Sequence, residues 1–254
     1  MPGSLAYLIL SVSDRLILER NVAISEIGIY NVAFTLSLAL NIVIQSGYKA
    51  IEPEIFKRYS SPDYYKFLRK VQSLFFVVIY VAGLGLTLFS QEVFYYFTAE
   101  PFHNAYKFVP ILIIGVIMTG QNVIYGGVLS AERKTKVVGM ATLCGAITSV
   151  SLNIFLTPVW GVTAAALSSA LSFFLMNTIL FVRMTYPGKS MLKETLSIIG
   201  VVVISLGLFY LFPSISWEGM AVKLLCLVAY AISLMLLFHL NIPQTLRMVF
   251  PAKK

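Results

Sequence analysis

An acid and a base, Asp14 and Arg15, lie inside a stretch that otherwise has the composition of a membrane-spanning helix. An ionised side chain at the centre of a bilayer costs about 2.5–3.5 kcal/mol, so such residues usually face a bundle interior or a wet cavity. Together with Ser4, Tyr7 and Ser11, these two residues fall on one side of a helix. This polar stripe predicts a contact with protein or water along that side.

Asp14 and Arg15 point in different directions, because neighbouring residues on a helix are about 100° apart. Arg15 can meet Glu19, four residues further on. In one interpretation Arg15 is a counter-ion for phosphate, which suits a guanidinium fork better than an ammonium group. In the other, Arg15 reaches the membrane surface beside Glu19 while Asp14 holds a neighbouring helix. The residues leave both interpretations open.

Further polar side chains follow in the later apolar segments. Polar residues recur along one helical face of the segment 27–51 and the residue after it, about 3.5 residues apart on average. They are Asn31, Thr35, Asn41, Gln45, Tyr48 and Glu52, with Lys49 beside them. The later runs add Gln121, Asn122, Tyr125, Thr142, Ser149 and Asn153. Our candidate substrate-binding residues are Asp14, Arg15, Asn31, Asn41, Gln45, Lys49, Gln121 and Asn122. For single amides the alternative is an interhelical hydrogen bond, worth about 0.6 kcal/mol in membranes.

The sequence has no enzyme signature. It contains no His, Cys, Asp and Glu set with metal-ligand spacing, no glycine-rich phosphate loop and no nucleophile elbow. Cys144 and Cys226 lie in apolar runs without CxxC or His-paired spacing. We therefore expect a protein that is not an enzyme and that has no metal or cofactor.

The composition is that of an integral membrane protein. Of the 254 residues, 58% are hydrophobic and 12% are charged, whereas soluble domains are about 45–50% apolar. The apolar runs are about 18–25 residues long and do not alternate, so their backbone must be satisfied as helices. The formal charge of +8 comes from short basic runs between apolar segments, which argues against nucleic-acid binding. We expect an all-α polytopic membrane helical bundle.

About eight transmembrane helices are predicted, at 2–18, 27–51, 71–89, 108–129, 137–157, 161–182, 196–212 and 221–240. The residues Pro158 to Gly161 predict a tight hairpin between antiparallel neighbours. The segment 52–70 mixes aromatic and basic residues, which predicts either a helix in the headgroup plane or a solvated linker. Lys and Arg concentrate in alternate connections, so both termini are predicted to be cytoplasmic.

Three stretches carry a resemblance to a known family. They are 14–18 followed by 27–33, then 129–136, and finally 153–166. In order and spacing they resemble the C-terminal half of polysaccharide-type flippases in the multidrug, oligosaccharidyl-lipid and polysaccharide exporter superfamily. Thr163 departs from the pattern, because the family often has a second glycine there.

The resemblance implies two six-helix lobes around a V-shaped cavity that opens to alternate sides. On that alignment, residues 1–185 form a six-helix lobe, residues 186–254 add two helices and a basic cytoplasmic tail, and the N-terminal lobe is missing. The chain then corresponds to helices seven to fourteen, and we expect it to be a truncated or partial transporter.

The implied function is to flip undecaprenyl-pyrophosphate-linked oligosaccharides across the bacterial cytoplasmic (inner) membrane, for O-antigen, lipopolysaccharide, capsule or exopolysaccharide biosynthesis. Arg15 and Lys49 would attract pyrophosphate, and the amides would bind sugar hydroxyls. The partners are then the lipid-linked oligosaccharide, membrane lipids, the missing lobe, and a proton or sodium coupling ion with Asp14 as its candidate group. Three alternatives stay open: a multidrug cation antiporter of the same superfamily, a polytopic enzyme of the polysaccharide pathway, and a non-transporting fragment.

Overall fold

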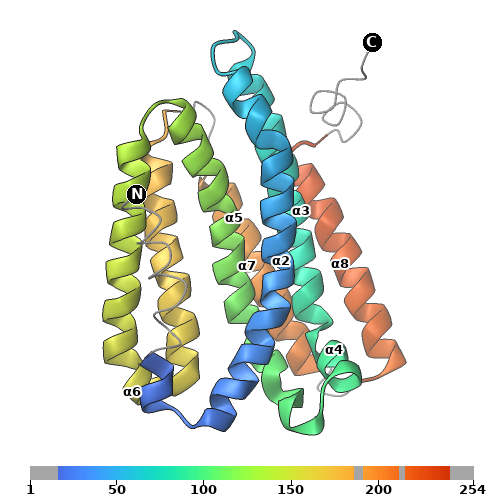
Figure 1. Ribbon diagram of the computed structural model, residues 1–254. Helices are drawn as coiled ribbons and strands as arrows, with labels where there is room; N and C mark the ends of the chain where they lie inside the picture. Colours follow the sequence, from blue (N-terminus) through green and yellow to red (C-terminus); the bar gives the residue numbers. More distant parts are fainter. Residues whose placement is uncertain (1–16, 186–190, 212–214, 241–254) are drawn as a thin grey trace.

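The computed structural model describes residues 17–185, 191–211 and 215–240, and the regular elements in these ranges are helices (Figure 1). After a helical turn at 17–21, the elements are α2 (Ile24–Lys57), α3 (Tyr64–Leu88), α4 (Ser90–Phe97), the 3₁₀ helix η1 (Glu100–Lys107), α5 (Val109–Ala131), α6 (Thr135–Arg183), α7 (Met191–Leu211) and α8 (Trp217–Leu237). Six of these helices are long and apolar enough to cross a membrane. The expected class, an all-α membrane helical bundle, is confirmed.

The helix α6 is a hairpin of two antiparallel halves (Figure 1). The chain reverses at Gly161, whose φ of 56° and ψ of −135° are not helical. A Cβ atom added at Gly145, in the first half, would lie 3.5 Å from Met176 Cβ in the second. The hairpin predicted at Pro158 to Gly161 is therefore present. The first predicted span, 2–18, lies outside the described residues except for its last two.

The segment 52–70, predicted as either a helix in the headgroup plane or a solvated linker, consists of the end of α2, a short connection and the start of α3. The helix α2 continues through Pro53 to Lys57, and α3 begins at Tyr64. With 34 residues, α2 is about 51 Å long, against a hydrocarbon core of about 30 Å. The two helices therefore extend beyond the bundle as a hairpin (Figure 1). Burial of Tyr64, Phe67 and Leu68 explains why these apolar residues favour helix packing over a surface position.

The connections divide the bundle into two ends. The α2–α3 connection with Arg58 and the α5–α6 connection with Arg133 and Lys134 lie at one end, which we call the basic end (Figure 1). The opposite end holds α4, η1 and the turn at Gly161 (Figure 1). The basic connections thus share one end, as the charge pattern predicts, and their cytoplasmic orientation stays a prediction.

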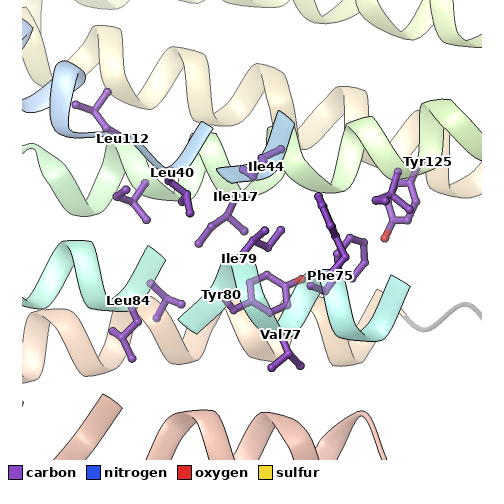
Figure 2. Packing of buried hydrophobic residues seen from close by; sticks show 14 of the residues in the cluster. Leu40, Ile44, Phe75, Val77, Ile79, Tyr80, Leu84, Leu112, Ile117 and Tyr125 are labelled. Atoms are coloured by element: carbon purple, nitrogen blue, oxygen red, sulfur yellow. The ribbon is translucent and has the colours of Figure 1, made fainter. Parts of the chain in front are cut away.

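The helix α5 is central to the core, with 72% of its candidate span buried, compared with 28% for α2 and 17% for α8. Figure 2 shows Ile44 of α2, Ile79 of α3 and Ile117 of α5 packed together in this core. A Cβ atom at Gly120 would come within 2.9 Å of the Ile79 Cδ1 atom and 3.1 Å of the Ile44 Cδ1 atom. Glycine therefore allows α5 to approach both neighbours closely.

The helices α7 and α8 pack against α3, and α8 lies on the side of the bundle away from α6 (Figure 1). Tyr230 Oη of α8 donates a hydrogen bond to the backbone oxygen of Ser197 on α7 across 2.5 Å. At the opposite end, Lys223 Nζ of α8 and Glu92 Oε1 of α4 form a buried ion pair at 2.5 Å. The first contact joins α8 to α7 and the second attaches α8 to α4. The division into domains at 185 and 186 stays a prediction.

Candidate substrate cavity

A cavity of about 960 Å³ lies toward the basic end, between α2, α5 and both halves of α6. Its walls are mainly apolar, with polar groups distributed around them. It is lined by Gln45, Tyr48, Glu52, Phe56, Thr119, Asn122, Val123, Gly126, Gly127, Ser130, Thr135, Lys136, Val138, Gly139, Met140, Thr142, Leu143, Phe173 and Met176. The volume lies within the range of about 300–1,000 Å³ that is usual for sites of small organic ligands.

The α2 wall presents a polar row on one helical face. Gln45, Tyr48 and Glu52 are three and four residues apart, so their side chains point to the same side. Tyr48 Oη donates a hydrogen bond to Glu52 Oε1 across 3.2 Å, and Gln45 Nε2 donates to Asn41 Oδ1 across 3.4 Å. This row supplies both donors and acceptors to a ligand.

The α5 wall combines an amide with small residues. Asn122 Nδ2 donates to the backbone oxygen of Phe173 across 3.4 Å, while Asn122 Oδ1 is buried and has no hydrogen-bond partner among the described residues. Gly126 and Gly127 leave space on the same wall, and a Cβ atom at Gly127 would collide with the Tyr48 hydroxyl. Asn122 Oδ1 is therefore an acceptor that a ligand hydroxyl can satisfy.

The α6 wall brings a positive charge to the cavity. Lys136 lines it and is exposed, and no ion pair to Lys136 is present in the described part of the chain. The nearby Lys134 Nζ is instead paired with Glu132 Oε2 at 2.7 Å. Lys136 is thus available to an anionic group of a ligand.

A second cavity of about 220 Å³ lies between the same helices, nearer the opposite end. It is lined by Tyr30, Phe34, Ser37, Leu38, Asn41, Ile111, Leu112, Gly115, Val116, Thr119, Ala166, Ser169, Ala170 and Phe173. Thr119 and Phe173 border both cavities. The two spaces therefore follow one another along the bundle.

The structure brings together some of the predicted site residues. Gln45 and Asn122 line the larger cavity, and Asn41 lines the smaller one. Asn31 is half-buried and Lys49 is exposed, and neither lines these two cavities. Asp14 and Arg15 lie outside the described residues.

Gln121, unlike Asn122, lines neither of these two cavities. It precedes Asn122 by one position on α5, so its side chain points about 100° away from that of Asn122. Its Nε2 atom donates to Tyr80 Oη on α3 across 2.6 Å, and its Oε1 atom accepts from Asn177 Nδ2 on α6. Gln121 therefore makes interhelical hydrogen bonds, which is the alternative to substrate binding that the sequence analysis gave for single amides.

Sequence reasoning missed part of the cavity wall. In the sequence Lys136 is one of several basic residues in a connection between apolar runs, and Gly126 and Gly127 carry no signal beyond their small size. The spacing from Gln45 through Tyr48 to Glu52 did carry a signal, because it continues the polar face of α2.

The fold and cavity define the class: a multi-pass helical membrane protein with a cavity between its helices. No family model and no curated protein matches the chain. Among solved structures, the fold is similar to that of the lipid II flippase MurJ in an inward closed conformation, with a TM-score of 0.66 and 14% sequence identity.

The match to this flippase covers 93% of the present chain and 52% of the flippase chain, so the protein spans about half the length of that structure. The coarser part of the expected resemblance, a flippase-type fold, is confirmed. The neighbouring protein is a flippase, that is a transporter rather than an enzyme, and it is named for lipid II rather than for an O-antigen unit.

Proposed function

We propose that the protein is a transporter that moves lipid-linked saccharide precursors between the two leaflets of a membrane. The main support for this proposal is the cavity of about 960 Å³ between α2, α5 and α6, in a bundle whose fold is similar to that of a lipid II flippase. A flippase needs space for a polar headgroup inside an apolar bundle, since that headgroup does not cross hydrocarbon unaided. The mainly apolar walls with scattered polar groups suit this task.

The proposed substrate is an undecaprenyl-pyrophosphate-linked oligosaccharide used for O-antigen, capsule or exopolysaccharide. Gln45 and Asn122 supply amide groups to sugar hydroxyls. Asn122 Oδ1 is the best-supported of these groups, because it is buried and has no hydrogen-bond partner among the described residues. Lys136 attracts the pyrophosphate at the wall of the cavity. Arg15 and Lys49, the anion candidates from the sequence, would act with Lys136 once cargo enters.

We further propose that transport needs a second lobe. The chain spans about half the length of the flippase structure, and only 28% of the candidate span in α2 is buried. An N-terminal lobe facing α2 would close the cavity on that side and allow alternating access. In this proposal the protein lies in the bacterial inner membrane with both termini in the cytoplasm, and proton or sodium coupling through Asp14 remains part of the hypothesis.

A second candidate function is the export of organic cations, as in a multidrug antiporter. One observation favours it: Glu52 places a carboxylate in the larger cavity, together with the rings of Tyr48, Phe56 and Phe173. A cation is attracted by a carboxylate and by aromatic faces. The two functions therefore differ in which cavity residues bind cargo.

A transport assay on vesicles tests the proposal. The gene is expressed at its full native length, and the protein is reconstituted into vesicles whose inner leaflet carries a fluorescent undecaprenyl-pyrophosphate oligosaccharide. An impermeant quencher then measures how fast the label reaches the outer leaflet. We expect time-dependent transfer that the double variant Gln45→Ala/Asn122→Ala slows several-fold, because it removes two sugar contacts.

Thr178→Ala is the matched control, since Thr178 Oγ1 bonds only locally to the Phe174 backbone oxygen and lies outside both cavities. No transfer above protein-free vesicles would refute lipid flipping. Equal transfer by the double variant and the wild type would refute the assigned sugar contacts. Uptake of an organic dye cation that Glu52→Gln abolishes, without any lipid transfer, would establish the second candidate instead.

A further inference from the structure

A buried carboxylate lies outside both cavities, where α7 packs on α3 and α5. The side chain is that of Glu194 near the start of α7, and the residue is 6% exposed. Gln72 Nε2 of α3 donates to Glu194 Oε1 across 3.3 Å, and Tyr125 Oη of α5 donates to Glu194 Oε2. Both partners are neutral groups.

No cationic side chain pairs with this carboxylate among the described residues. The adjacent Lys193 directs its Nζ atom to the backbone oxygen of Leu237 at the end of α8, at 2.8 Å. The titratable side chains that interact with Glu194 from the neighbouring helices are the phenols of Tyr80 on α3 and Tyr125 on α5. The basic residues of α3 (Lys66, Arg69 and Lys70) form no ion pair with Glu194 in the described part of the chain. An uncompensated buried charge carries an effective penalty of several kcal/mol, so binding of a positive charge is favoured here.

The side chain beside this carboxylate has an unused acceptor. Gln72 is 6% exposed, and its Oε1 atom is buried without a hydrogen-bond partner in the described part of the chain. The other atom of the same amide, Nε2, is the one that donates to Glu194. A buried acceptor left unpaired costs about 1–3 kcal/mol, which a bound cation would recover.

The donor set indicates the kind of cation. Carboxylate, amide and hydroxyl oxygens are hard ligands, which suit alkali and alkaline-earth ions or a proton rather than a transition metal. A single carboxylate balances a single charge. The described residues contain no group of three or more His, Cys, Asp or Glu side chains that would hold a divalent ion.

We propose that Gln72, Tyr125 and Glu194 form a binding site for one monovalent cation, either a proton or Na⁺. Sodium would be bound by Glu194 Oε1 and by Gln72 Oε1, once the amide turns over so that its oxygen replaces Nε2 beside the carboxylate. A proton on Oε1 would instead be donated to Gln72 Oε1 after the amide turns over. In either form the cation cancels the charge that α7 carries into the bundle and holds α7 against α3 and α5.

The site is coupled by position to the cavity wall. Tyr125 lies on the same helix as Asn122, three residues further along, and Phe76 of α3 stacks edge-on against the Tyr125 ring at 5.9 Å between centroids. Occupancy of the cation site therefore acts on the helix that carries the proposed sugar contact. The site itself rests on the buried groups alone and holds whatever the cargo is.

Thermal unfolding of the purified full chain in detergent tests the site without any transport measurement. The probe is Na⁺, exchanged for choline at constant ionic strength, at several values of pH. We expect the wild-type Tm to rise with Na⁺ if the ion is sodium, because a ligand that binds only the folded state stabilises it. If the ion is a proton, we expect Tm to rise as the pH falls and to ignore Na⁺.

Glu194→Gln mimics the neutral carboxyl, and we expect it to remove the response and to raise Tm above that of the wild type in alkaline choline buffer. Glu218→Gln changes an exposed carboxylate at the start of α8 and should keep the wild-type response. A wild-type Tm that ignores both Na⁺ and pH would overturn the proposal, as would a full response in Glu194→Gln.

Gln72→Met keeps the Glu194 carboxylate and removes the amide oxygen. This variant therefore tests the cation site if Glu194→Gln yields no folded protein. If the ion is sodium, we expect the Na⁺ concentration at the midpoint of the Tm response to change several-fold in this variant. If the ion is a proton, we expect the proton activity at the midpoint to change several-fold. An unchanged midpoint in this variant would rule out the assigned site. Failure of lipid transport in the vesicle assay would leave these outcomes unaffected, so the two proposals fail separately.

Discussion

Asn177, in the second half of α6, donates a hydrogen bond to Gln121 on α5, and Gln121 in turn donates to Tyr80 on α3 across 2.6 Å. All three side chains are buried, so a chain of polar contacts crosses the interior from α6 to α3. Asn122, the next residue on α5, faces the cavity. The orientation of the cavity wall is therefore set by a polar contact behind it.

Replacing Gln121 by Leu should destabilise the bundle by about 1 kcal/mol, because Asn177 and Tyr80 lose a buried partner. Asn177→Leu should have a similar effect. The double variant should cost less than the sum of the two, since it leaves fewer unpaired groups. Unfolding in a denaturing detergent measures all three variants, and strictly additive losses would show that the two amides do not depend on each other.

Gly139→Leu should obstruct transport without unfolding the protein. Gly139 lines the larger cavity, and a Cβ atom there meets nothing within 4 Å, so the longer side chain enters empty space. We expect transfer of the fluorescent lipid-linked oligosaccharide to fall several-fold, while Tm stays within a few degrees of the wild type. Gly139→Ala is the matched control and should transport normally. Normal transport by the Leu variant would place the cargo elsewhere.

Gly161→Ala should destabilise the α6 hairpin by about 1–3 kcal/mol, because an L side chain does not suit a φ of 56° and a ψ of −135°. The cost is one of backbone conformation, since the nearest atom to an added Cβ, Val22 Cγ2, is at an ordinary 3.9 Å. Gly139→Ala, within the first half of the same helix, should be neutral or stabilising by about 0.5–1 kcal/mol. Thermal unfolding compares the two, and equal effects would contradict this reading of the turn.

Lys223→Met should be strongly destabilising, by about 3–5 kcal/mol, because it leaves the buried Glu92 carboxylate without its partner. The double variant Glu92→Gln/Lys223→Met should recover much of this loss, as it removes both charges. Chemical unfolding of the single and double variants measures the difference. A neutral single variant would mean that the pair does not hold α8 to α4.

The positions of the helices could be predicted from the sequence with small errors. The predicted span 108–129 corresponds to α5 at Val109–Ala131, and the predicted span 71–89 overlaps α3 at Tyr64–Leu88. Hydrophobic length and the breakers Pro158 and Gly161 determine such features locally, because a backbone in lipid has to satisfy its own hydrogen bonds. The end of α2 was missed, since Pro53 lies within the helix rather than at its end.

The roles of single polar residues depended on the tertiary structure. Both Gln121 and Asn122 are amides in one apolar run, and only the packing of α5 against α3 and α6 shows that one faces the interior and the other the cavity. Glu194 gave no signal in the sequence, where it stands beside Lys193 at the start of an apolar run.

The helical, membrane-spanning class of the protein can be predicted from the sequence alone, because hydrophobicity, span length and turn residues act within a short stretch of chain. The packing of the helices is needed to show which polar groups meet, where the cavity around Asn122 lies and that the carboxylate of Glu194 is buried. The physical reason is that burial and pairing depend on residues far apart in the chain. Gln72 and Glu194 are 122 positions apart, and their contact exists only where α3 and α7 pack together.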